Sequence, residues 1–158
     1  MRRTFADELL KQAKTNHGII VVTMDLGYKL WDEFQNELPD QFYNLGASEQ
    51  SALGISVGLA LQGKIPFVYS ITPFLLYRGF ETIRNHIDHE KIGVRLVGSG
   101  RDNSYEHDGF SHDASDAKKI LSNFKNIQCY WPKNKEAVPD LVKVMIETNE
   151  PSFISLKR

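Results

Sequence analysis

Short runs of β-branched and aromatic residues alternate along the chain with longer stretches of helical periodicity. The run 19–24 is apolar at almost every position, which is typical of a strand that is covered on both faces of a sheet. Because such runs alternate with helical segments, the pattern predicts one α/β domain, residues 1–158, with a largely parallel sheet and helices on both faces. We expect strands at 19–24, 42–44, 66–70, 92–97, 127–131 and 152–156, and helices at 4–15, 29–37, 49–62, 72–89, 113–122 and 134–147.

The expected helix 49–62 is apolar on nearly every side, and a helix of this kind is normally buried. Ser48 precedes it and is expected to cap the first turn through its hydroxyl. Gly54 and Gly58 lie one turn apart on one face. Since glycine costs roughly 1 kcal/mol relative to alanine in a helix interior, the pair indicates that another backbone or a cofactor approaches closely. Gly63 is expected to end the helix.

Glu49 places a carboxylate at the start of this apolar helix, and two interpretations of it remain open. It can be a first-turn acid that faces the positive end of the helix dipole, worth roughly 0.3–1 kcal/mol. It can also be a buried acid with a raised pKa that serves proton chemistry. The local sequence does not separate the two.

Composition narrows the class of protein. The chain has 158 residues, 41% hydrophobic and 25% charged, which is ordinary for a globular domain. Its net charge of −1 gives no electrostatic case for binding nucleic acid or an anionic membrane. It has no run of about 20 apolar residues and no signal-peptide pattern, and its single cysteine, Cys129, is expected to be a small core residue. A cytoplasmic location is therefore expected.

Polar residues gather where expected strands end, which is where ligands bind in parallel α/β sheets. Asp25 follows the first strand, residues 70–72 follow the third, and the polar loop 98–113 follows the fourth. Glu49 follows the short second strand. We therefore expect these groups to approach one another at one edge of the sheet.

Several weaker motifs each have a structural interpretation. Residues 98–100, Gly-Ser-Gly, lack the remainder of a phosphate-loop pattern and are expected to form a turn. His86 and His89 are expected to face solvent, and the segment 107–113 has no recognisable zinc template, so no metal ligands are assigned. The segment is instead expected to place a histidine and a carboxylate over a cleft.

Three aromatic residues, Phe74, Tyr77 and Phe80, recur at a spacing of three along the helix expected at 72–89. Such a series usually packs into a core. The alternative is a platform on which a planar ring stacks.

Taken in order, these segments resemble the pyrimidine-binding domain of transketolase-type thiamine diphosphate enzymes, the group that includes transketolase and deoxyxylulose-phosphate synthase. The resemblance covers nearly the whole chain from about residue 21. It is carried by MDLG at 24–27, FYNLGASEQ at 42–50, GISVGLALQG at 54–63, YSITPFLLYRGFETIRNHI at 69–87, KIGVRLVGSG at 91–100, HDGFSHDASD at 107–116, YWPKNKEAV at 130–138 and PSFISLKR at 151–158.

The resemblance implies a role for particular residues. The acid matching Glu49 hydrogen-bonds N1′ of the cofactor's aminopyrimidine, which favours the imino tautomer that removes the thiazolium C2 proton. Phe74 or Tyr77 would stack on the pyrimidine; the register leaves both open. His112 matches a histidine that lines the substrate channel, and Asp25 matches an acidic position near the thiazolium.

The resemblance also implies a partner, because the family's Gly-Asp-Gly segment, which holds Mg²⁺ and the diphosphate, is absent from this sequence. The chain ends where the family's third domain would begin, so it is expected to be one subunit of a split enzyme. A diphosphate-binding transketolase-like subunit would supply the rest of the site in a hetero-oligomer, expected to be a heterotetramer. The expected reaction transfers a two-carbon unit from a keto donor to an aldehyde or sugar acceptor. The alternatives are a 2-keto acid decarboxylase subunit and a non-catalytic assembly module.

Overall fold

The computed structural model describes all of residues 1–158 and contains a single sheet of six parallel strands in the order β2-β1-β3-β4-β6-β5. This confirms the predicted α/β class. Strands β2 and β5 form the two edges and are only three residues long. The strands are β1 (Ile19–Thr23), β2 (Phe42–Asn44), β3 (Ile65–Ile71), β4 (Arg95–Ser99), β5 (Gln128–Tyr130) and β6 (Ser152–Leu156).

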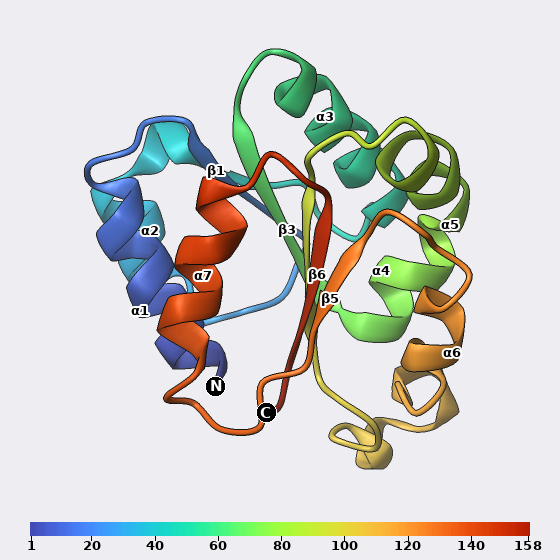
Figure 1. Ribbon diagram of the computed structural model, residues 1–158. Coiled ribbons are helices and arrows are strands. Elements are labelled where there is room, and N and C mark those ends of the chain that lie inside the picture. The colour runs from blue at the N-terminus through green and yellow to red at the C-terminus, as the bar shows by residue number, and fades with distance from the viewer.

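Helices cover both faces of the sheet (Figure 1). Helices α1, α2 and α7 lie on one side, and α3, α4, α5 and α6 lie on the other. Short helical turns join them, and a π-helical segment follows α5. The helices are α1 (Arg2–Ala13), α2 (Asp32–Glu37), α3 (Glu49–Leu61), α4 (Thr72–Arg78), α5 (Phe80–Thr82), α6 (Ala117–Leu121) and α7 (Val138–Glu147), and the turns are η1 (Pro39–Gln41), η2 (Ile83–His89, π-helical), η3 (Glu106–Asp108) and η4 (Phe110–His112).

Alternate residues of the central strands enter two separate cores, which is why those strands are apolar at consecutive positions. In β1, Ile19 and Val21 pack under α1, α2 and α7, whereas Ile20 and Val22 pack under the helices of the opposite face. Each core contains 18 buried hydrophobic residues. The sheet is therefore a rigid support for the loops at its edges.

The loops that carry the polar clusters leave the sheet at the carboxyl ends of the strands. The long connection between β4 and α6 lies beyond this edge in Figure 1, and the C-terminus leaves β6 there too. The chain passes from β1 to β2 in one direction and then returns past β1 to β3, which makes the β1–β3 boundary the kind of switch point where ligands bind. No helix in the structure has both the length and the apolar character needed to cross a membrane.

Helix α3 is not buried on all sides, so that prediction was wrong. Its inner face, which includes Leu53 and Val57, packs against the sheet, but Ile55 is 46% exposed and Leu61 is 66% exposed. The helix ends as predicted, with Gly63 at φ +79° directly beyond its last turn. Nothing within this chain covers the second apolar face.

The predicted continuous helix at 72–89 is divided into α4, α5 and η2, with a break at Gly79. A Cβ atom at Gly79 would lie 1.8 Å from Cδ1 of Leu53 on α3, so only glycine allows the two helices to pack this closely. Elsewhere the predicted elements are correct in type but shifted at their ends. In particular β4 continues to Ser99, so the Gly-Ser-Gly motif is mostly strand, and only Gly100, at φ +84°, makes a turn.

Candidate active site

Glu49 is the first residue of α3, and its side chain is only 3% exposed. Ser70, near the end of β3, donates a hydrogen bond to Oε1 at 3.2 Å, and Arg78 donates to Oε2 from Nη1 at 2.8 Å. Ser48 does not cap the helix as predicted, because its hydroxyl turns back and donates to the carbonyl of Leu45 at 2.6 Å. Glu49 is therefore a buried carboxylate in the first turn of α3, with both oxygens hydrogen-bonded.

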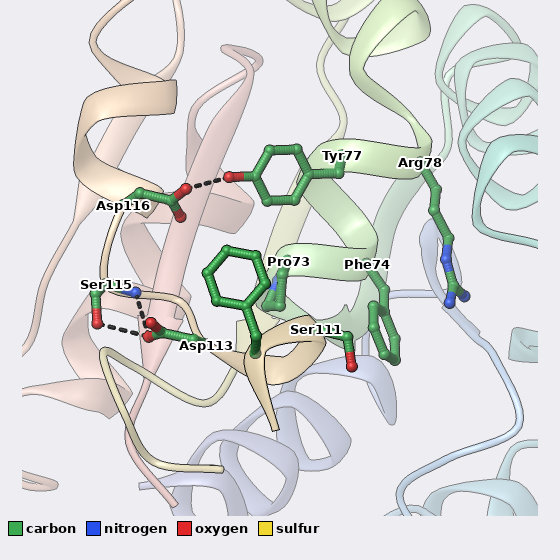
Figure 2. Close-up of a pocket in the computed structure, with 9 residues that line it drawn as sticks. Pro73, Phe74, Tyr77, Arg78, Ser111, Asp113, Ser115 and Asp116 are labelled. Carbon is green, nitrogen blue, oxygen red and sulfur yellow. Dashed lines mark hydrogen bonds between the residues drawn. The ribbon is translucent and has the colours of Figure 1, made fainter. Parts of the chain in front are cut away.

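The ring of Phe74, on α4, lies beside the ion pair between Glu49 and Arg78. The guanidinium carbon of Arg78 lies 4.0 Å from the ring centroid, and the two side chains run side by side from the same helix in Figure 2. The imidazole of His112 meets the Phe74 ring edge-on, with centroids 4.8 Å apart and planes at 67°. Glu49, Arg78, Phe74 and His112 thus form one connected group, although they come from three separate segments of the chain.

The loop that carries His112 is held by hydrogen bonds to the end of the sheet. Thr72 donates to the carbonyl of Gly100 at 2.6 Å, and the hydroxyls of Tyr69, Ser99 and Tyr105 form a buried chain with successive separations of 3.0 and 2.9 Å. Burial raises the pKa of Tyr69, so its hydroxyl stays protonated and can donate within this chain. The loop is therefore positioned by the scaffold and not only by its own contacts.

A pocket of about 520 Å³ opens between α4 and this loop (Figure 2). Tyr77 donates a hydrogen bond to Asp116 across it, and this bond raises the pKa of Tyr77 to about 12. The Ser115 hydroxyl and backbone N–H both donate to Asp113 and lower the pKa of that carboxyl. The lining residues are Pro73, Phe74, Tyr77, Arg78, Phe110, Ser111, Asp113, Ser115 and Asp116.

The aromatic series on α4 and α5 does not enter the core, contrary to its usual interpretation. Phe74 is half-buried at the site, Tyr77 is 53% exposed, and Phe80 packs its ring against Phe124 with centroids 5.4 Å apart. Of the two candidates for a stacking ring, Phe74 lies against the Glu49–Arg78 pair and Tyr77 lies further along the pocket wall. The geometry thus separates two residues that the sequence left equivalent.

Asp25 shares no hydrogen bond with this group. It follows β1, is exposed, and accepts a hydrogen bond from the hydroxyl of Tyr28 at 2.8 Å. None of its hydrogen bonds reaches Glu49, Phe74 or His112. His86 and His89 are exposed, as predicted, and no group of three or more His, Cys, Asp or Glu side chains is arranged to hold a metal ion.

Sequence analysis missed Arg78, and it predicted the proximity of Ser70 to Glu49 but not their hydrogen bond. Arg78 follows Phe74 by four positions on a helix, so the spacing alone would have placed both on one face. Its pairing with Glu49, 29 residues away, has no local signal. Ser70 was placed in a polar cluster after the third strand, but its bond to Glu49 depends on how α3 crosses the sheet.

The fold defines a parallel α/β domain whose candidate site lies at the carboxyl ends of the strands, where proteins of this class bind their ligands. The sequence matches the family described as the transketolase pyrimidine-binding domain over residues 1–158. The chain therefore belongs to this family.

Individual relatives agree with this assignment. The chain is 28% identical to a putative transketolase C-terminal section of Methanocaldococcus jannaschii, with all of this chain and 50% of the relative aligned. It is 30% identical to one subunit of the apulose-4-phosphate transketolase of Phocaeicola vulgatus, covering 99% of this chain and 51% of that protein. The solved structure of a split-gene transketolase, an inactive beta4 tetramer, superposes with a TM-score of 0.88 at 28% identity over 99% of this chain and 51% of its own. The chain thus spans about half the length of these relatives.

Proposed function

We propose that this chain supplies the aminopyrimidine-binding half of a split, thiamine diphosphate-dependent transketolase-like enzyme. The enzyme would move a two-carbon ketol unit from a keto donor to an aldehyde or sugar acceptor. The observation that carries the proposal is the buried Glu49 carboxylate, held at the start of α3 beside the Phe74 ring. Glu49 is paired, but a buried ion pair contributes little net stability because desolvation offsets its attraction, so a buried carboxylate beside an aromatic ring at the edge of a parallel sheet is a candidate functional group.

The residues present fit the pyrimidine half of the cofactor. An aminopyrimidine offers a ring face for stacking and a ring nitrogen that can share a proton with a carboxyl group. Phe74 would provide the stacking face and Glu49 the proton-sharing partner, with Ser70 fixing the other carboxylate oxygen. When bound, the cofactor supplies the carbon nucleophile of the reaction. His112, whose ring touches Phe74, would contact the substrate, and Asp25 is proposed to lie near the thiazolium ring of the cofactor.

The diphosphate and its Mg²⁺ would be held by a partner chain. A two-chain arrangement is supported by three relatives, which are a transketolase subunit, a transketolase C-terminal section and a split-gene transketolase. The split-gene protein is inactive as a tetramer of one chain type.

Purified alone, the present chain should bind thiamine diphosphate weakly and should not turn over substrate. Calorimetry that finds tight, Mg²⁺-dependent binding to the isolated monomer would contradict the two-chain arrangement.

The partner surface is proposed to be the exposed face of α3, formed by Gly54, Ile55, Gly58 and Leu61. A Cβ atom at either glycine would meet no atom within 4 Å, so the close approach that these glycines permit is not used inside this chain. The face is apolar, and the helix begins at Glu49. A chain that packed on it would cover exposed hydrophobic surface and lie next to the site.

Glu49→Gln tests the assignment directly, because glutamine keeps the size of the side chain but cannot share a proton in the same way. In the assembled enzyme the exchange of the cofactor's C2 proton for deuterium, followed by NMR, should slow by about 10²–10⁴-fold, while cofactor affinity changes little. A helix-dipole role predicts instead a stability change of roughly 0.3–1 kcal/mol and normal exchange. Normal exchange in the variant would therefore remove Glu49 from the chemistry.

A further inference from the structure

Arg78 contacts both of the groups that the proposed function assigns to the pyrimidine. Its Nη1 donates to Glu49 Oε2 at 2.8 Å, and its guanidinium carbon lies 4.0 Å from the centroid of the Phe74 ring. Arg78 and Phe74 are four residues apart on α4, which places them on one face of the helix. A single side chain therefore covers the aromatic face and one carboxylate oxygen together.

A guanidinium group resembles an aminopyrimidine in the features that matter here. Both are flat and delocalised, both stack on aromatic rings, and both present N–H donors in the plane of the group. The ring face of Phe74 and the space beside Oε2 of Glu49 that Arg78 occupies cannot hold a second planar group at the same time. We propose that Arg78 is an internal occupant of the pyrimidine site, which must leave Glu49 and Phe74 before the ligand ring can bind. This inference rests on the proposed function.

The surroundings of Arg78 allow it to leave. Its side chain is 48% exposed, it is the last residue of α4, and its bond to Glu49 is the one hydrogen bond that its guanidinium makes. The other two arginines near the sheet are different. Arg95 and Arg101 are buried, and each donates three hydrogen bonds, mostly to backbone carbonyls, which is the pattern of a structural arginine.

Glu49 does not lose all its partners when Arg78 moves away. Ser70 still donates to Oε1, and a proton shared between Oε2 and a ring nitrogen of the incoming ligand would replace the bond from Arg78. In the chain without ligand, Arg78 also prevents Glu49 from being a buried carboxylate without a cation, an arrangement that is strongly unfavourable. Arg78 thus stabilises the empty site and competes with the ligand for the same contacts.

The test compares ligand binding by the full chain and by variants of it. The probe is the free aminopyrimidine alcohol of thiamine, which carries no diphosphate and so does not need the partner chain. NMR follows the ring signals of Phe74 and the guanidinium nitrogens of Arg78 during the titration. Arg78→Ala should bind the probe about 5- to 30-fold more tightly, because a half-exposed ion pair and a cation–π contact no longer compete. Arg78→Lys, which keeps the charge but not the planar group, should show a smaller gain.

Two further variants separate the possible outcomes. Arg84→Ala removes an exposed arginine elsewhere on the same side of the sheet and should bind like the wild type. Phe74→Ala should abolish saturable binding in every background. If binding depends on Phe74 but Arg78→Ala binds equally or more weakly, the inference about Arg78 is wrong and the proposed function stands. If neither the wild type nor Arg78→Ala shows Phe74-dependent binding, the pyrimidine site itself is refuted, and the inference is refuted with it.

Discussion

Gly54 and Gly58 lie on the exposed face of α3. We predict that alanine at these positions stabilises the isolated chain, whereas a larger side chain weakens its association with a partner chain. Gly54→Ala and Gly58→Ala each add a methyl group that meets no atom within 4 Å of this chain. Alanine also loses less backbone entropy than glycine on entering a helix. Each substitution should therefore raise the free energy of unfolding by about 0.5–1 kcal/mol. The pair should raise the thermal midpoint by about 2–8 °C for a chain of this size.

Larger side chains at the same positions test the partner surface. Gly58→Leu should leave the isolated chain folded, because the position faces away from the core. It should weaken association with a partner chain that carries the Gly-Asp-Gly segment by about 5- to 150-fold, since forcing a large side chain into a packed contact typically costs about 1–3 kcal/mol. Sedimentation velocity with both purified chains measures the affinity, and calorimetry of the isolated chain measures stability.

Two matched variants control for unrelated effects. Gly79→Ala should destabilise the chain, because its Cβ atom would lie 1.8 Å from a carbon of Leu53. Val144→Leu enlarges an exposed apolar residue of α7, on the opposite side of the sheet, and should not affect assembly. A loss of stability in Gly54→Ala would show that this face of α3 is already packed in the isolated chain. Wild-type association by Gly58→Leu would show that the partner binds elsewhere.

Three further predictions concern other parts of the molecule. Arg95→Met removes the donor that bonds the carbonyls at the end of α7. The free energy of unfolding, measured by denaturant titration, should fall by about 2–4 kcal/mol. Arg84→Met, at an exposed arginine, should lower it by less than about 0.5 kcal/mol. Burial raises the pKa of Cys129 from 9.0 to about 11. At about pH 8 its thiol should therefore react with a disulfide reagent roughly 100-fold more slowly in the folded than in the unfolded chain, and equal rates would contradict this. Its contribution to the free energy of unfolding should fall as the pH rises from 9.0 toward about 11, because the unfolded chain loses the thiol proton first. His112→Ala should lower kcat/KM of the assembled enzyme at least about tenfold with cofactor affinity unchanged, whereas a merely structural role would lower the thermal midpoint and leave kcat/KM intact.

The fold could be predicted from the sequence because its signals are local. The strands are consecutive apolar runs, and Glu49 is recognisable as the first residue of a helix from the turn that precedes it and the periodicity that follows. The parallel topology brings the carboxyl ends of the strands to one edge, so the proximity of Glu49 and Ser70 also followed.

What the sequence could not show depends on contacts between distant elements. The break at Gly79 follows from the packing of Leu53 against it, and no pattern within residues 72–89 reveals that neighbour. The exposure of Leu61 could not be deduced either, because an apolar face has the same sequence whether this chain or another covers it. Likewise, Arg78 could be placed beside Phe74 by spacing, but its choice of Glu49 as partner depends on the tertiary fold.

The position of Glu49 at the start of α3 connects the two proposals. The same helix carries the site carboxylate at its first residue and the exposed glycine face along its length, so a partner on that face would lie beside the site. If the cofactor contacts both chains, it binds the assembled state more tightly than the separate chains and stabilises it by mass action. By reciprocity, the factor by which the partner increases cofactor affinity must equal the factor by which the cofactor increases partner affinity. Arg78 has the opposite effect on ligand affinity. It stabilises the chain without ligand and so lowers the affinity of the unassembled chain for the pyrimidine ring.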